Sequence, residues 1–204
     1  MRVSSRGSAV LSLKSCLLII LMVVLCPFQT HAEPTISSKT QYYSIEGRDA
    51  RTLRNQMTAK GPKGIGGNSK RRFWAHTRWY VDWRFSYAHR GLGCAITSVD
   101  VRVRTLFEMP RWKNAKGASA KLKESWQTFY KNLDAHEKQH ARHGVDAGHA
   151  VERAIKNMTD DKGCTSLYKR ANDVAGNTVG KYAQKDIDFD KATKHGATSG
   201  VALK

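Results

Sequence analysis

The sequence predicts an α+β fold in which a small antiparallel sheet is followed by a long helix and one or two further helices. Two stretches before residue 105 alternate apolar with polar side chains, as half-buried strands do. After residue 118 the apolar residues recur at steps of three and four, which is the spacing of one helical face. Strands therefore precede helices in a domain that we expect to cover residues 33–204.

The first 32 residues have the features of a secretory signal peptide. Three basic residues precede an uncharged apolar run, Leu17–Leu25, and small residues occupy the cleavage-site positions 30 and 32. The run is about half as long as a membrane-spanning helix. We expect cleavage near Ala32 and export to the periplasm or beyond, with an uncleaved N-terminal anchor as the alternative.

Cys94 and Cys164 are the two cysteines that follow the predicted signal peptide. In an oxidising compartment, two cysteines in one domain are most simply paired, so we predict a disulfide between them. A pair of thiolate metal ligands would have a much closer spacing in the sequence.

The chain is strongly basic, with a formal net charge of +18. An excess of this size attracts polyanions, and an exported protein meets anionic lipids and envelope polymers first. We therefore expect such partners rather than a specific nucleic acid. The basic residues are scattered, however, and Lys70-Arg71-Arg72 is the one tight cluster. A solvated surface explains the charge equally well.

Most elements of the first half follow from alternation and from turn residues. The predicted elements are a strand at 41–45, a short helix at 49–59, strands at 79–87 and 99–103, and a turn at 89–93. The glycine-rich stretch 61–69 lacks the lysine–serine pair of a phosphate-binding loop, so we predict a connector there. Residues 109–117, which include a proline, are predicted to break the strand pattern.

A long helix is predicted from an N-cap at Ser119 to about residue 157. One face of it carries Trp126, Phe129, Leu133, His136 and His140. Two glycines, Gly144 and Gly148, weaken the helical propensity in the middle of this stretch. A loop around residue 163 separates the long helix from a further one, predicted at 166–185.

His136-Glu137-Lys138-Gln139-His140 forms an H-E-x-x-H motif on the long helix. Residues four apart differ by about 40° in direction and lie about 6 Å apart along the axis, so both imidazoles can reach one zinc ion. Glu137 is rotated by about 100° and stays beside the ion. Its carboxylate can act as general base toward a water whose pKa the metal lowers. The alternative is two unrelated histidines beside a glutamate.

A catalytic zinc ion needs a third protein ligand and one open coordination position. His143 shares the helix face but lies about 10.5 Å along the axis from His136. Asp146 stands at the third ligand position of a metzincin motif, although the glycine of that motif is missing. A ligand from another element is easier to accept, and the C-terminal segment offers Asp190 and His195.

The chain resembles the bacterial DUF922 family, which is described as predicted secreted zinc-dependent proteases. The similar parts are the tyrosine-rich first strand, the tryptophan-rich strand, the strand after Cys94, the Trp-x-x-Phe-x-x-x-Leu stretch before the motif, and a C-terminal segment similar to Tyr-Asp-x-x-Thr-x-His-Gly. Phe189 replaces the first tyrosine of that segment, so any role of its hydroxyl is missing here. The resemblance implies zinc and proteolysis. As third ligand we favour His195, with Asp190 orienting a histidine ligand.

These observations favour an exported zinc-dependent metallopeptidase that cleaves protein or peptide substrates, with Glu137 as general base and Zn²⁺ as cofactor. The alternative is a non-catalytic basic protein that binds anionic envelope polymers or lipids and carries a structural or vestigial zinc site. Nuclease activity at the same metal has only the charge in its favour. The oligomeric state is not predicted.

Overall fold

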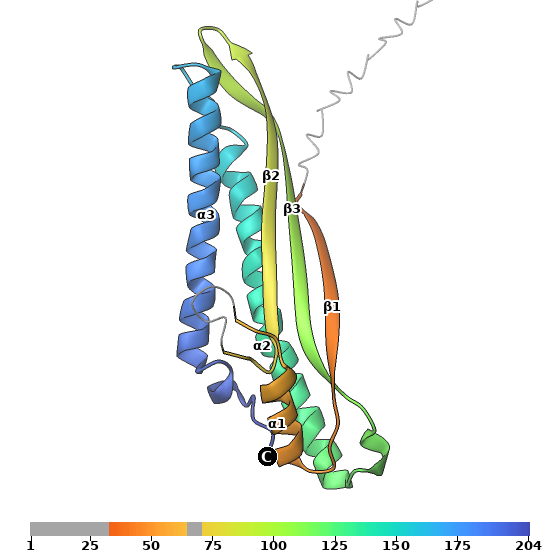
Figure 1. Ribbon diagram of the computed structural model, residues 1–204. Helices are drawn as coiled ribbons and strands as arrows, with labels where there is room; N and C mark the ends of the chain where they lie inside the picture. Colours follow the sequence, from red (N-terminus) through yellow and green to blue (C-terminus); the bar gives the residue numbers. More distant parts are fainter. Residues whose placement is uncertain (1–32, 65–70) are drawn as a thin grey trace, which may run out of the picture. The chain divides into compact units, whose positions relative to one another are not determined.

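The computed structural model describes residues 33–64 and 71–204 (Figure 1). The predicted signal peptide with its cleavage site near Ala32, and residues 65–70 of the predicted connector, lie outside the described residues. Within the described residues, no helix is both long enough and apolar enough to cross a membrane.

The sheet is mixed. Its strands are β1 (Thr35–Ile45), β2 (His76–Arg90), β3 (Gly93–Trp112) and the short β4 (Thr159–Asp160). β3 pairs antiparallel with β2 and β4 and parallel with β1. The α+β class and the long helix are confirmed, but the prediction of an antiparallel sheet is wrong for β1. Alternation reports which face of a strand is buried and not the direction of its neighbour, so it carried no information on this pairing.

The strands also extend beyond their predicted ends. The sequence predicts a break at 109, whereas β3 continues through Pro110 to Trp112. Over this stretch β1 stays in register with β3, with Tyr43 opposite Pro110. Pairing with a neighbouring strand, which local sequence does not reveal, therefore overrides the proline signal.

The α-helices of the described residues are α1 (Ala50–Lys60), α2 (Ala120–Ile155) and α3 (Cys164–Thr193). As predicted, Ser119 caps α2, because its hydroxyl accepts a hydrogen bond from the backbone N–H of Leu122 at 3.2 Å. α3 is longer than the predicted helix at both ends, and its last two turns carry Asp186 and Asp190.

Two buried clusters fix α2 against its neighbours. The first joins α2 to α1 and the sheet, and includes Phe129, Leu133, Leu53, Met57, Ile45 and Met109. The second joins the end of α2 to β3 and α3, and includes Val151, Ile155, Val101, Leu167 and Ala171. In Figure 1, α3 runs beside α2 and both follow the strands. The H-E-x-x-H motif lies between the two clusters along α2.

The predicted disulfide is confirmed. Cys94 at the start of β3 and Cys164 at the start of α3 are bonded, with 4.9 Å between their Cα atoms. The cross-link holds the beginning of α3 to the sheet and so helps to set the path along which α3 approaches α2.

Candidate metal centre

The two histidines of the H-E-x-x-H motif converge on one point. His136 and His140 are 6% and 8% exposed, and their Nε2 atoms lie 3.3 Å apart. Both side chains leave the same face of α2, one helical turn apart, because they are four residues apart in sequence, and that face packs toward β2 and α3.

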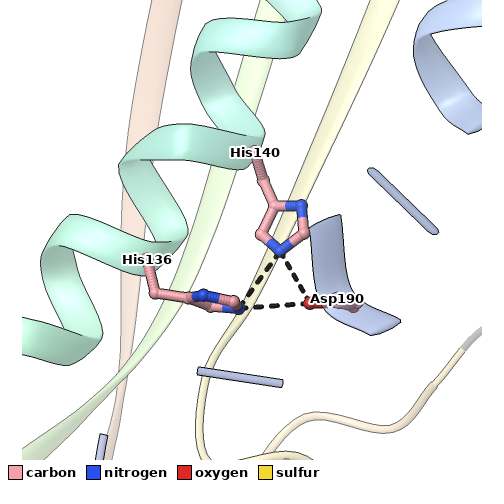
Figure 2. Close-up of side chains that lie close together, drawn as sticks. All are labelled: His136, His140 and Asp190. Carbon is pink, nitrogen blue, oxygen red and sulfur yellow. Dashed lines mark hydrogen bonds and ion pairs between the residues drawn. The ribbon is translucent and has the colours of Figure 1, made fainter. Parts of the chain in front are cut away.

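Asp190 of α3 completes this group (Figure 2). Its Oδ1 atom lies 3.1 Å from the Nε2 atom of His136 and 3.1 Å from the Nε2 atom of His140. The three ligand atoms therefore form a nearly equilateral triangle, contributed by two neighbouring helices. Such a group of two imidazole nitrogens and one carboxylate oxygen could hold a metal ion.

The size of this triangle fits zinc. Ligands bound tetrahedrally at about 2.0–2.1 Å from the ion are about 3.3 Å from one another, and the separations here are 3.1 and 3.3 Å. Nitrogen and oxygen donors in this combination are also the ligands of catalytic zinc sites. Both the chemistry and the spacing of the donors therefore suit zinc.

A second acidic residue of α3, Asp186, holds the other side of His140. Its Oδ1 atom lies 3.0 Å from the Nδ1 atom of His140 and 2.5 Å from the Nδ1 atom of His143. Its Oδ2 atom accepts a hydrogen bond from the indole N–H of Trp79 at 2.5 Å. His140 thus lies between two carboxylates, with Asp190 at one ring nitrogen and Asp186 at the other.

This arrangement shifts the pKa values of the group. Burial disfavours the charged form of His140, but its hydrogen bonds with Asp186 and Asp190 outweigh that effect and raise its pKa to about 10. Burial acts in the opposite sense on Asp190, yet hydrogen bonds with His136 and His140 hold its pKa well below the usual range. The pKa of Asp186 is lowered in the same way by His140, His143 and Trp79. Without a metal ion, the two carboxylates are therefore negative and His140 holds a proton, which a bound cation would displace.

Glu137 is buried beside the two imidazoles. Burial is the largest influence on its carboxyl group and raises its pKa, while a hydrogen bond from Thr77 and the two histidines act against burial. The hydroxyl of Thr77 donates to Oε2 of Glu137 at 2.7 Å. Glu137, His136, His140 and Asp190 line one hollow of about 400 Å³. A carboxylate whose pKa is raised toward neutrality, at the wall of such a hollow, is suited to accept a proton during a reaction.

The structure places the other predicted residues around this group. His195 is 43% exposed and contacts Asp190, with its Nδ1 atom 3.2 Å from Oδ2. His143 contacts Asp186 rather than the triangle, and Asp146 is exposed and belongs to neither metal-binding group found among the described residues. Asp190, which the sequence suggested as an orienting residue, supplies a ligand atom of the triangle.

Asp186 was not predicted as a site residue, although the sequence contains a signal for it. Asp186 and Asp190 are four residues apart, as the two histidines are, so they share one face of any helix that contains both. The predicted helix ended at 185, one residue before this pair. Phe189 lies between them in sequence, and its ring stacks on His136 with centroids 4.8 Å apart.

The comparison with protein families assigns the chain. A family model described as a bacterial protein of unknown function, DUF922, matches residues 40–196. The chain belongs to the DUF922 family. The matched part of this DUF922 protein includes α2 with the H-E-x-x-H motif, both aspartates of α3 and His195. Comparisons with curated proteins and with solved structures gave no match.

Proposed function

We propose that this DUF922 protein is an exported zinc-dependent peptidase, in which His136, His140 and Asp190 hold the metal and Glu137 is the general base. The observation that carries the proposal is the triangle of donor atoms at 3.1 and 3.3 Å, next to a buried glutamate with a raised pKa. Three protein ligands leave one tetrahedral position open, which is the arrangement of catalytic rather than structural zinc.

In this mechanism the metal ion would activate the substrate and the water, and the protein transfers the proton. A zinc ion held there would polarise the substrate carbonyl and lower the pKa of a water molecule. Glu137 takes the proton from the attacking water and returns it to the leaving amine. The hydrogen bond from Thr77 fixes the carboxylate of Glu137 for both transfers. Because burial raises the pKa of Glu137, the carboxyl group exchanges protons nearer neutral pH than an exposed glutamate does.

The third ligand is Asp190 in this proposal, and His195 takes the orienting role. The sequence had suggested the reverse. Oδ1 of Asp190 is within 3.1 Å of both imidazoles, whereas His195 reaches only Oδ2 of the same carboxylate, at 3.2 Å. A ring nitrogen that contacts the free oxygen of a ligating carboxylate helps to hold that ligand in place. His195 is also well exposed, as a residue at the mouth of a site would be.

Export is part of the proposal. A disulfide between Cys94 and Cys164 supports an oxidising compartment, in which such bonds persist. The signal-peptide features of the first 32 residues agree with it. Sequencing the N-terminus of the protein recovered from the envelope or the medium tests this point, with a mature end near residue 33 as the expected result.

Metal content and cleavage are best measured together on one set of variants. Purified wild-type protein should bind one zinc ion per chain and cleave denatured protein. Glu137→Gln should keep the zinc and lose cleavage by at least about a hundredfold, as expected when a general base is removed. His136→Ala, His140→Ala and Asp190→Ala should lose the zinc. His149→Ala, a histidine of α2 outside both metal-binding groups, is the matched control and should behave as wild type.

The outcomes separate the alternatives. Full activity in Glu137→Gln would refute the mechanism. Zinc binding without cleavage, together with salt-dependent binding to anionic polymers, would favour the non-catalytic basic protein. Digestion of DNA in place of denatured protein would indicate a nuclease. Retention of zinc by Asp190→Ala and its loss from His195→Ala would return the third-ligand role to His195.

A further inference from the structure

Asp186 of α3 makes several side-chain hydrogen bonds that link α3 to its neighbours. It accepts hydrogen bonds from three side chains on two different elements: His140 and His143 of α2, and Trp79 of β2. It lies one helical turn before Asp190 on α3. Its carboxylate is therefore fixed from both sides, with one oxygen facing α2 and the other facing β2.

We propose that Asp186 is a positioning residue for the metal centre, which acts through His140. When the Nδ1–H of His140 donates to Asp186, the neutral ring has its lone pair at Nε2, the nitrogen that lies 3.3 Å from His136 and 3.1 Å from Asp190. Asp186 thereby fixes both the tautomer and the direction of the ring, and its charge makes the imidazole a stronger donor to a cation. This inference rests on the metal centre of the proposed function and not on peptide cleavage.

The alternative for Asp186 is a second metal ion, bound with His140 and His143. The distances argue against it. Two ligands of one zinc ion are about 3.3 Å apart, but Oδ1 of Asp186 is only 2.5 Å from Nδ1 of His143. This separation is that of a short hydrogen bond and is too small for two ligands of one ion. In addition, a second ion would require His140 to bind metal through both nitrogens, which a neutral imidazole with one N–H cannot do.

Trp79 holds Asp186 through a bond that involves no histidine. Its indole N–H donates to Oδ2, so the carboxylate is tied to the sheet on the side away from His140, which contacts Oδ1. A parallel bond exists further along the same two elements, where the indole N–H of Trp83 donates to Oδ1 of Asn172 at 2.9 Å. That second bond also ties β2 to α3, but it involves no histidine. It provides a matched control.

The test compares Asp186→Asn with Asn172→Ala. Asparagine keeps the size of aspartate and one oxygen acceptor but has no charge, so Asp186→Asn should bind zinc about 10- to 100-fold more weakly than wild type in chelator competition. The visible spectrum of the cobalt-substituted protein should change as well, because it reports the geometry and donor strength of the ligands. Asn172→Ala removes a tie between the same two elements and should leave zinc affinity and the cobalt spectrum unchanged. Trp79→Phe removes the indole N–H that holds Asp186 and should weaken zinc binding less than Asp186→Asn does. If Asp186→Asn does not fold, the zinc affinity of Trp79→Phe tests the inference in its place.

Three results would overturn the inference. One is a wild-type zinc affinity and cobalt spectrum in Asp186→Asn. Another is equal loss of affinity in Asp186→Asn and Asn172→Ala, which would indicate a purely structural tie. The third is two zinc ions in wild type that fall to one in His143→Gln, which would establish the second metal site. If wild type binds zinc but cleaves no peptide, the peptidase proposal fails while weaker zinc binding by Asp186→Asn still supports the role of Asp186. A wild-type protein that binds no zinc would remove both.

Discussion

Gly144 of α2 lies directly against Trp79 of β2. A β-carbon added at Gly144 would stand 2.6 Å from both Cβ and Cγ of Trp79, closer than such atoms approach in real structures. Trp79 is also the residue that holds Asp186 through its indole N–H. The absence of a side chain at one position of α2 therefore sets how near this helix comes to the strand that holds Asp186 of the candidate metal centre.

Gly144→Ala should destabilise the protein, although alanine is the better helix former. Alanine gains about 1 kcal/mol of helical propensity over glycine, but forcing a methyl group against the base of a packed tryptophan costs about 1–3 kcal/mol. The base of that side chain cannot swing aside as a flexible tip would. We expect a net loss of up to about 2 kcal/mol in the free energy of unfolding, measured by urea denaturation.

Gly176→Ala and Gly180→Ala are the matched controls. Both glycines lie on α3, and an added β-carbon there meets no atom within 4 Å. These two variants should be more stable than wild type, by up to about 1 kcal/mol each. A gain of similar size in Gly144→Ala would show that α2 and β2 are not in such close contact.

The sequence was informative wherever a pattern is local. Ser119 and the apolar steps that follow it define the start and the buried face of α2, and the two histidines fall on that face. The hairpin of β2 and β3 follows from alternation and from the glycines between the strands. Cys94 and Cys164 pair as expected, because two cysteines in one oxidised domain have no other partner.

Features that depend on tertiary contacts could not be predicted. The parallel pairing of β1 with β3 joins strands that are distant in sequence and has no periodicity of its own. The sequence prediction ended this helix at 185, whereas α3 packs against α2 and continues to Thr193. The sequence also could not show that Asp190, and not His195, lies beside the imidazoles. Only the path of α3 past α2 determines which of these two residues reaches them.

Thr77→Val should shift the pH dependence of peptide cleavage. The hydroxyl of Thr77 lowers the pKa of Glu137 by bonding its charged form, so removing the hydroxyl raises that pKa further. The general base must be deprotonated, and the acid limb of kcat/KM should therefore move to higher pH, by about one to two units for a hydrogen bond of about 1.5–3 kcal/mol to a charged group. Thr105→Val, a buried threonine of β3, is the control. An unchanged acid limb in Thr77→Val would show that Glu137 does not set it.

Reduction of the disulfide should cost much of the protein's stability. Cys94 and Cys164 are 70 residues apart in sequence, and closing a loop of that length restricts the unfolded chain by about 4 kcal/mol in the chain-entropy account. Urea denaturation of oxidised and reduced wild type measures the effect without altering the side chains that pack around Cys94. The double variant Cys94→Ala, Cys164→Ala should match reduced wild type to within the cost of the small cavity. An unchanged urea midpoint after reduction would contradict the prediction.

His76 should make the protein less stable in mild acid. Burial lowers its pKa below the ordinary value of 6.5, with nearby Arg78 and His140 acting in the same direction. Between pH 7 and 5 the unfolded chain therefore takes up a proton at this residue more readily than the folded chain does, and the free energy of unfolding falls. His76→Gln should lose less stability over this range than wild type when both are measured without metal. An NMR titration midpoint for His76 at or above 6.5 would show the opposite linkage.

Phe189→Ala should weaken zinc binding through His136. His140 is oriented by Asp186, but the Nδ1 atom of His136 is buried without a hydrogen-bond partner among the described residues. The ring of His136 is held instead by stacking on Phe189, with 4.8 Å between the ring centroids and 23° between the ring planes. Aromatic pairs of this kind contribute about 0.5–1.5 kcal/mol, which corresponds to a loss of zinc affinity of about two- to tenfold.

Phe189→Tyr tests the same contact from the other direction. A tyrosine keeps the stacked ring, so zinc affinity should stay near that of wild type. Ile187→Ala, a change at an exposed residue of the same helical turn, controls for loss of helix stability. If Phe189→Ala and Ile187→Ala weaken zinc binding equally, His136 does not depend on the ring of Phe189. If Phe189→Tyr alone strengthens binding, a phenolic hydroxyl adds a contact that this chain lacks.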